Sequence, residues 1–361
     1  MRFGIAVYVN EDFPLNRNLE YVNTAKEFGI DRVFTSMHLP EVDYDQKLSE
    51  IIELISDIKK SAMKLTIDIS PVTLSVVRAS VDNLQFFAGL HIDCLRLDYG
   101  FRSAEIVAMA NNQFGIGLEL NASTIGREQI EEMIHSGVPL KRLRMGHNFY
   151  PHPFTGLSSD FFIRKTTMLK EYGIPVAAFI PSQSGKRGPL YEGLPTLEQH
   201  RYLKPSIAAR HLTYLRLVDE VYFGDAYAVP EELREVASLD DSILEIGIKL
   251  AEGTTEDEKD IIFAGIHTNR TDASEYIIRS EESRGYARIG KAIAARNCLT
   301  RGKYMVTIDN IGFKRYSGEL QICMSDLPPD HRVNVVGHIS ADEHILADLI
   351  KPGVKFRFKE A

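Results

Sequence analysis

The sequence predicts a (β/α)8 TIM barrel followed by a small, mostly β domain. Short apolar runs alternate with helical stretches through the first two thirds of the chain, which is typical of a parallel α/β fold. Eight such runs and seven helical segments fit into about 225 residues, and a (β/α)8 barrel takes roughly 250. From about Asp240, strand-like runs separated by turn residues replace the alternation. We therefore expect a catalytic barrel over residues 1–239 and a β domain over residues 240–361.

The first half of the predicted barrel consists of four apolar strands joined by helices. The strands are expected at residues 3–9, 31–38, 64–70 and 92–98. Helices are expected near 16–28, 45–61 and 80–88, and Gly29 supplies a stop signal for the first of them.

The second half repeats this order, with strands expected at residues 115–121, 140–146, 174–180 and 219–224. A helical stretch at 206–217 precedes the last of them. A doubly wound open sheet would also alternate in this way, but no G-x-G-x-x-G motif follows the first strand. The closed barrel is therefore favoured.

The β domain is predicted from strand-like runs separated by Gly, Asp, Asn and Pro. Its length of about 120 residues is ordinary for a domain. The runs are ILEIGIKLA, IIFAGIHT, EYIIRS, KYMVTIDN, GELQICM, RVNVVGHI and VKFRFK.

Composition indicates a protein that acts on a small molecule. The net charge is -8 and no long Lys or Arg run is present, so neither nucleic acid nor an anionic membrane is an expected partner. No apolar stretch approaches the ~20 residues of a membrane span. The three cysteines, Cys94, Cys298 and Cys323, are widely separated, which suits reduced thiols. With a strand-like run in place of a signal peptide at the N-terminus, we expect a cytoplasmic protein. Nothing indicates its oligomeric state.

Side-chain parity predicts which residues line the barrel. Alternate residues of a barrel strand point inward, and active sites form at the carboxyl ends of the strands. In the strand at 64–70 the Leu and Ile positions suit the helix-covered outer face, which leaves the alternate residues inside. Applied to four strands, this parity directs inward Thr66, Asp68, Ser70, Arg96, Asp98, Gly117, Glu119, Asn121, Arg142, Arg144, Gly146 and Asn148.

Three neighbouring strands thus each direct an acid toward the mouth: Asp68, Asp98 and Glu119. Charges inside a barrel are costly unless they are paired or used. One interpretation is a structural network between these acids and the inward arginines. The other is catalysis, because glycoside cleavage needs two carboxyl groups, about 5–5.5 Å apart for retention and about 6.5–9.5 Å for inversion. We assign Asp98 and Glu119 to that pair, and Asp68 and Asn121 to substrate binding.

The loop after the sixth strand, HNFYPHPFTGL, is stiffened by its two prolines. We expect His147, Asn148 and Tyr150 to form a wall of a sugar site. His147 and His152 fit no standard zinc spacing, so no metal is expected here. The alternative is an ordinary turn containing a hydrogen-bonded histidine.

The loop at 181–201, after the seventh strand, is long enough to suggest a function. Lys186 and Arg187 lie among Ser and Gly residues, which suits an anion such as phosphate. A solvated basic turn is the alternative. Glu198 is expected to cap a helical turn. Other binding candidates are Glu192 in this loop, Asp225 after the last strand and Arg270 in the second domain.

Six segments spread over both domains resemble the bacterial 6-phospho-N-acetylmuramidase family, once catalogued as a domain of unknown function. They are AVYVN, LRLDYG, LELNAS, HNFYPHPFTGL, RGPLYEGLPTLEQHR and RYSGELQI. The resemblance implies a TIM barrel followed by a cyclophilin-like β-barrel domain. It also implies hydrolysis of the β-1,4 bond between N-acetylmuramic acid 6-phosphate and N-acetylglucosamine, a disaccharide of cell-wall recycling that is phosphorylated as it enters the cell. It supplies no catalytic residues.

Two other functions remain open from the sequence. A divalent-metal isomerase or phosphodiesterase would use Asp68, Asp98, Glu119 and His147 as ligands. A non-catalytic sugar-binding protein would bind without turnover. For the glycoside hydrolase no cofactor is expected, and retention, inversion and assistance by the substrate's acetamido group are all compatible with the sequence.

Overall fold

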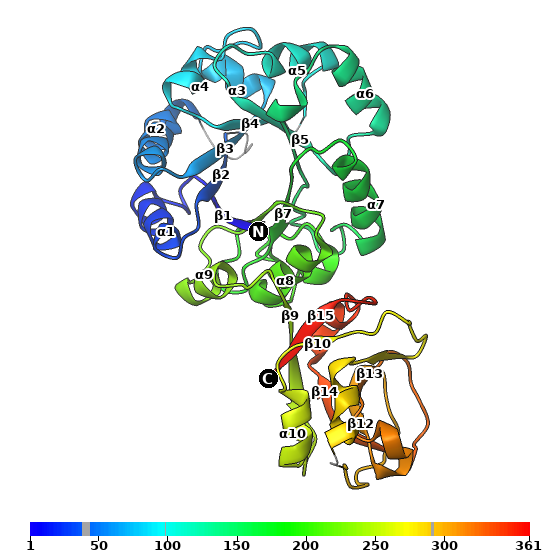
Figure 1. Ribbon diagram of the computed structural model, residues 1–361. Coiled ribbons are helices and arrows are strands. Elements are labelled where there is room, and N and C mark those ends of the chain that lie inside the picture. Colours follow the sequence, from blue (N-terminus) through cyan, green and yellow to red (C-terminus); the bar gives the residue numbers. More distant parts are fainter. Residues whose placement is uncertain (38–43, 98, 290–291) are drawn as a thin grey trace. The chain divides into compact units, whose positions relative to one another are not determined.

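Eight parallel strands close into a barrel, each hydrogen-bonded to the next in sequence order and β8 to β1 (Figure 1). The computed structural model describes residues 1–37, 44–97, 99–289 and 292–361. It divides into two compact units, Met1–Leu239 and Asp240–Ala361. The barrel strands are β1 Arg2–Val7, β2 Arg32–Ser36, β3 Lys64–Ile69, β4 Cys94–Leu97, β5 Gly117–Asn121, β6 Leu143–Gly146, β7 Val176–Ile180 and β8 Glu220–Phe223. The predicted (β/α)8 barrel is confirmed.

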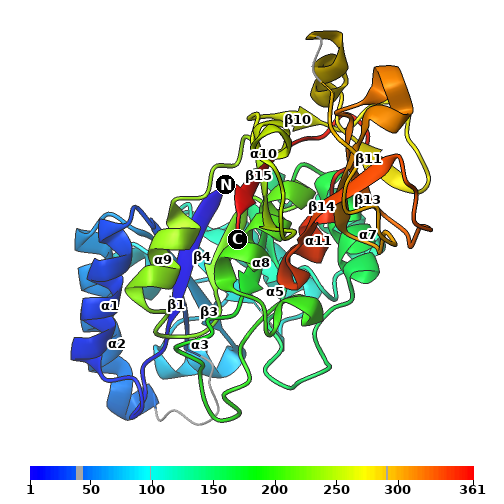
Figure 2. The same cartoon turned by 90° about the horizontal axis from the view of Figure 1, so that it is seen from below.

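Helices surround this barrel, and α1 and α2 lie side by side on its outside (Figures 1 and 2). The α-helices of this unit are α1 Leu15–Glu27, α2 Tyr44–Lys60, α3 Pro71–Val76, α4 Gln85–Gly89, α5 Ser103–Ala110, α6 Arg127–His135, α7 Ser159–Lys170, α8 Pro205–Leu215 and α9 Pro230–Ala237. Two short 3-10 helices, η1 Leu140–Arg142 and η2 Glu198–His200, accompany them.

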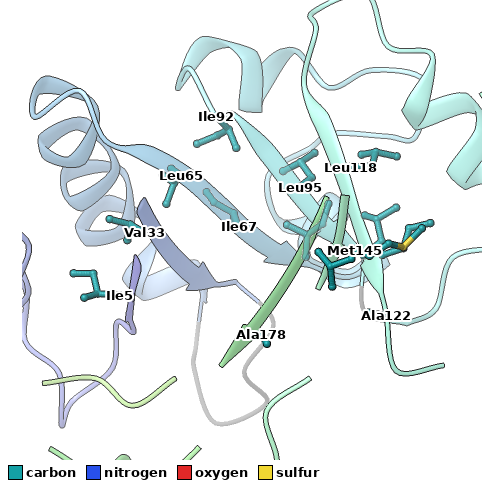
Figure 3. Packing of buried hydrophobic residues seen from close by; sticks show 14 of the residues in the cluster. Ile5, Val33, Leu65, Ile67, Ile92, Leu95, Leu118, Ala122, Met145 and Ala178 are labelled. Carbon is teal, nitrogen blue, oxygen red and sulfur yellow. The ribbon is translucent and has the colours of Figure 1, made fainter. Parts of the chain in front are cut away.

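The outer faces of the strands form the main hydrophobic core with the helices (Figure 3). Burying one such aliphatic side chain fully contributes about 1.5–3 kcal/mol to folding. The residues of this face include Ile5, Val33, Leu65, Ile67, Leu95, Leu118 and Met145. A second, aromatic cluster lies on the inner faces and includes Phe34, Phe179 and Tyr222. The predicted parity therefore holds: alternate residues separate helix packing from the barrel interior.

The sixth strand begins later than predicted. Residues 140–146 were expected to be one strand, but Pro139 starts a 3-10 turn, in which Arg142 N donates to its carbonyl (2.8 Å), and β6 begins only at Leu143. The Arg142 guanidinium donates to the Asn112 carbonyl instead of entering the barrel interior. The prediction that Arg142 points inward was wrong, because the turn removes it from the strand whose parity was used.

The helix predicted near 80–88 is replaced by two short helices, α3 and α4. Ser70 caps α3 directly after β3, since its hydroxyl accepts from Thr73 N (3.4 Å) and Pro71 occupies the first helical position. Ser70 is therefore a helix cap.

The second unit is a seven-stranded sheet in the order β10-β15-β9-β14-β12-β13-β11. Its strands are β9 Leu244–Leu250, β10 His267–Thr268, β11 Ile277–Arg279, β12 Met305–Asp309, β13 Leu320–Cys323, β14 Val333–Ile339 and β15 Lys355–Glu360. Its helices are α10 Glu256–Ile262, α11 His344–Ala347, η3 Glu282–Ile289, η4 Ile311–Tyr316 and η5 Ala341–Glu343. The prediction of a mostly β domain is confirmed.

One run in this unit was misassigned. IIFAGIHT was predicted to be a strand, but its first residues complete α10, and only His267–Thr268 form a strand. Thr255 and Glu258 cap that helix reciprocally, which fixes its start before the apolar run begins. No helix in the described part of the chain is long and apolar enough to cross a membrane.

Candidate active site

A buried ion pair lies inside the barrel, toward the carboxyl ends of its strands. Arg96 of β4 and Glu119 of β5 are register partners, and Arg96 Nη1 lies 2.7 Å from Glu119 Oε1. Each residue is only 3% exposed. Arg96 also donates to the Gly146 carbonyl (3.1 Å) and to Asn148 Oδ1. One guanidinium therefore joins three successive strand ends, and these bonds offset the cost of burying the charges.

Gly146 makes room for this pair. A Cβ built at residue 146 would overlap Glu119 Oε1 and Arg96 Nη1. The lack of a side chain at this position in β6 thus lets two charged side chains from neighbouring strands meet inside the barrel.

Asp68 lies beside the pair in the same layer. It is the register partner of Arg96 on β3, and Ser36 of β2 donates from Oγ to its Oδ2 (3.3 Å). The predicted residues Asp68, Glu119 and Asn148 are thus brought together around Arg96. Asp98 follows directly after β4 in the sequence and lies outside the described residues.

A second charged layer lies nearer the amino ends of the strands. Glu220 of β8 accepts from Tyr222 OH (2.9 Å), pairs with Arg144, and lies 3.2 Å from Arg32 Nε. Glu220 is 1% exposed. This layer is a structural network of the kind expected from the sequence, but its acid is Glu220, which is not among the predicted site residues. Applying the same parity to the strand at 219–224 would have directed Glu220 inward.

Arg187 extends over the aromatic side of the mouth. Its guanidinium carbon lies 4.3 Å from the centroid of the Tyr8 ring and 5.4 Å from that of Phe149. Among the described residues, no acceptor is within hydrogen-bond reach of its buried Nη1. Burial raises the pKa of Tyr8 to about 12, and the Tyr8 hydroxyl donates to the Gly224 carbonyl (2.7 Å). The rings of Tyr8 and Phe149 thus support the Arg187 guanidinium, and its Nη1 can donate a hydrogen bond to an anion.

Asp225 holds the loop that carries Arg187. Its Oδ2 accepts from Ser182 N (2.9 Å) and Leu194 N (3.1 Å), and its Oδ1 accepts from Arg187 N (2.9 Å). Burial raises its pKa, and these backbone donors oppose the rise. Asp225, a binding candidate from the sequence, has no exposed surface and is placed to position the loop.

The backbone of this loop has little capacity left for an anion. Gln183 N donates to Glu232 (2.8 Å), and Ser184 N and Gly185 N both donate to Ser182 Oγ. Ser182 Oγ in turn donates to Glu232 (2.6 Å). Anion binding at this loop therefore depends on its side chains. The Lys186 ammonium lies 5.4 Å from the centroid of the Tyr202 ring.

Glu198 clamps the two mouth loops together. It accepts from Phe154 N (2.9 Å) and Gly156 N (2.7 Å) in the loop after β6, and from the fully buried Arg201 (2.6 and 2.7 Å). Arg201 also donates to the His152 carbonyl (3.2 Å). The Arg201 guanidinium and the backbone donors lower the pKa of Glu198 to about 2. The expected capping role is thus replaced by a link between loops that are distant in sequence.

His147 lies beneath the mouth. Its Nδ1 lies 3.1 Å from Ser123 Oγ, its Nε2 lies 2.9 Å from Thr166 Oγ1, and its ring packs on Phe162. It has no exposed surface, and burial lowers its pKa to about 3, so the ring is neutral. His147 thus fits the alternative stated from the sequence, a hydrogen-bonded histidine in a turn, rather than a residue that contacts substrate.

The remaining candidates are spread over both units. Asn121 Oδ1 accepts from Ser123 N (2.9 Å), and Tyr150 N donates to the Pro195 carbonyl (3.0 Å). Glu192 accepts from Tyr202 OH (3.4 Å) at the exposed part of its loop. Arg270 belongs to the second unit, where it pairs with Asp272 (2.6 Å). Within the described ranges, no group of three or more His, Cys, Asp or Glu side chains is placed to hold a metal ion.

A (β/α)8 barrel with charged side chains at its carboxyl end is the architecture of a barrel enzyme. Residues 3–238 match the family model described as 6-phospho-N-acetylmuramidase, N-terminal, and residues 244–359 match the one described as 6-phospho-N-acetylmuramidase, C-terminal. The chain belongs to the 6-phospho-N-acetylmuramidase family of glycoside hydrolases.

Two solved structures are similar over nearly the whole chain. A crystal structure of an uncharacterized Bacillus cereus protein is 34% identical, with 99% of each chain covered and a TM-score of 0.88. A conserved Enterococcus faecalis protein of unknown function is 33% identical, covers 100% of this chain and 96% of its own, and has a TM-score of 0.74. No curated protein matches the chain.

Proposed function

We propose that this protein hydrolyses the β-1,4 bond between N-acetylmuramic acid 6-phosphate and N-acetylglucosamine. The observation that carries the proposal is the combination, at one barrel mouth, of a carboxylate layer around Arg96 with an Arg187 donor that has no acceptor among the described residues. The first suits bond cleavage in a sugar, and the second suits the phosphate that distinguishes this substrate from a plain disaccharide.

Glu119 is proposed to act as a carboxylate. The Arg96 guanidinium at 2.7 Å compensates a negative charge on it. A compensated carboxylate suits the nucleophile, or the group that stabilises positive charge developing on the sugar ring or orients the acetamido group. It does not suit the proton donor.

Asp98 is proposed as the proton donor to the glycosidic oxygen. The assignment rests on its place in the sequence, directly after Leu97, the last residue of β4, because active sites of such barrels form at the carboxyl ends of the strands. Asp68, one strand further, is proposed to bind a sugar hydroxyl near the same bond, together with Asn148.

Arg187 and Lys186 are proposed to hold the 6-phosphate. A guanidinium offers five N–H donors in a planar fork that matches phosphate oxygens. Arg187 is positioned for this before substrate arrives, because Asp225 fixes its backbone and the rings of Tyr8 and Phe149 support its side chain. Since the phosphate is added on entry into the cell, the proposal also places the protein in the cytoplasm and in cell-wall recycling.

The direct test is incubation with 6-phospho-N-acetylmuramyl-N-acetylglucosamine, followed by mass analysis of the products. We expect N-acetylmuramic acid 6-phosphate and N-acetylglucosamine, with activity lost in Glu119→Gln and Asp98→Asn. Glu128→Gln, on the outer helix α6, is the matched control and should retain activity. The anomer first released distinguishes retention from inversion. Absence of cleavage, or full activity in both site variants, would refute the proposal.

A further inference from the structure

The second unit contains a cleft of about 250 Å³ lined by Arg284, Arg315, Tyr316 and Glu319. Its volume is just below the roughly 300–1,000 Å³ of drug-sized ligand sites, which suits a smaller ligand. Its lining combines both signs of charge with one aromatic side chain. None of these residues belongs to the barrel, so the proposed hydrolysis does not use them.

The negative part of the cleft is buried. Glu319 is 4% exposed, and its carboxylate lies 3.8 Å from Arg284 Nε, beyond hydrogen-bond distance. Asp309 is 6% exposed and adjoins it, with Asp309 N donating to the Glu319 carbonyl (3.0 Å). Within the described part of the unit, Asp309 Oδ1 has no hydrogen-bond partner. Burial, and next the charge of Glu319, raise the pKa of Asp309 to about 7. Glu319, the acid that lines the cleft, is therefore suited to an incoming cation, with Asp309 as its neighbour outside the lining.

The positive part of the cleft is accessible. Arg315 is exposed, its Nη2 donates to Tyr316 OH (2.7 Å), and its guanidinium carbon lies 4.9 Å from the centroid of that ring. This bond uses one of five N–H donors and leaves the rest for an anion. The turn before Arg315 is unusual, since Lys314 has φ 54° and ψ -111°. Sparsely populated backbone conformations of this kind recur at ligand sites.

We propose that this cleft binds a small zwitterion, with an ammonium group at Glu319 and a carboxylate at Arg315 and Arg284. The free end of an amino acid or short peptide has this chemistry. A purely anionic ligand would place negative charge beside Glu319, and a purely cationic ligand would place positive charge beside Arg284 and Arg315.

The test uses the full chain and calorimetric titration with L-alanyl-L-alanine, its N-acetyl form, its C-terminal amide and inorganic phosphate. We expect the unmodified dipeptide to bind and each blocked form to bind about tenfold more weakly or less, because each leaves a charged group of the cleft without its partner. Arg315→Ala, at an exposed position, should weaken binding of the dipeptide by a similar factor. Glu319→Gln should remove the preference for the free amine.

Lys351→Ala, an exposed charge change in the same unit, is the control and should bind as the unmodified protein does. No dipeptide binding at millimolar concentration, equal binding of the blocked forms, or unchanged binding in Arg315→Ala would each overturn the proposal. Tighter binding of phosphate than of the dipeptide would overturn it in favour of a simple anion site. Because binding is measured without the disaccharide, these outcomes are independent of hydrolysis.

Discussion

Arg96 and Glu119 meet inside the barrel, Nη1 to Oε1 at 2.7 Å, in space that exists because residue 146 is glycine. The pair joins β4 and β5, and through the Gly146 carbonyl it also joins β6. Its geometry affects both stability and the proposed reaction.

Gly146→Ala should destabilise the protein by about 1–3 kcal/mol, the usual cost of overpacking a full interior. Its methyl group would force Glu119 and Arg96 apart, so hydrolysis should fall as well. Urea unfolding and turnover measure the two effects. Gly89→Ala, in the helix α4, is the matched control: no described atom lies within 4 Å of a Cβ there, and Ala favours helix, so this variant should not lose stability. Equal stabilities of the two variants would contradict the packing described here.

Removing either partner of the pair should destabilise the protein strongly. Arg96→Met or Glu119→Gln alone leaves an uncompensated buried group, and breaking a buried pair in this way typically costs about 3–5 kcal/mol. The double variant should lose less than the sum of the single losses. A double-mutant cycle by denaturant unfolding measures this difference. Strict additivity would mean that the two side chains do not interact.

Arg187→Ala should reduce kcat/KM for the phosphorylated disaccharide about 10- to 100-fold, the range expected for losing a charge-assisted hydrogen bond of about 1.5–3 kcal/mol. Activity on the disaccharide without phosphate should change far less. Kinetics on both substrates test this, with Arg127→Ala on the outer helix α6 as the control. If Arg187→Ala lowered activity equally on both substrates, Arg187 would not bind the phosphate.

The Glu198 clamp should make stability depend on acid pH. Its pKa falls from 4.5 to about 2 on folding, so the folded state favours the charged form. The stabilisation is therefore fully present above pH 4.5 and is lost as pH falls toward 2. The difference in unfolding free energy between the protein and Glu198→Gln should be largest near neutral pH and shrink below pH 4.5. A difference independent of pH would contradict the clamp.

Much of the site could be predicted because parity is a local property of a strand. Once the strands at 64–70 and 115–121 were recognised, the alternation of Leu and Ile with polar residues was enough to direct Asp68 and Glu119 inward. The error at Arg142 came from one strand boundary, where Pro139 begins a turn that alternation alone does not reveal.

Pairing between side chains was decided by the tertiary structure. Which arginine meets Glu119 depends on the register between β4 and β5, and register is set by hydrogen bonds between segments distant in sequence. In the same way, Glu198 contacts Phe154 N and Gly156 N across 44 and 42 residues, and no local pattern marks such a contact.

The sequence by itself determined the class of fold and several of the polar residues inside the barrel, Asp68 and Glu119 among them, because periodicity and turn chemistry are local properties of a sequence. Only the tertiary structure separated residues that share a motif. His147 and Asn148 are neighbours in the chain directly after β6. The His147 side chain is buried against Thr166, whereas the Asn148 side chain contacts Arg96. Successive side chains of an extended chain point in opposite directions, so the tertiary structure decides which residues of a motif face the site.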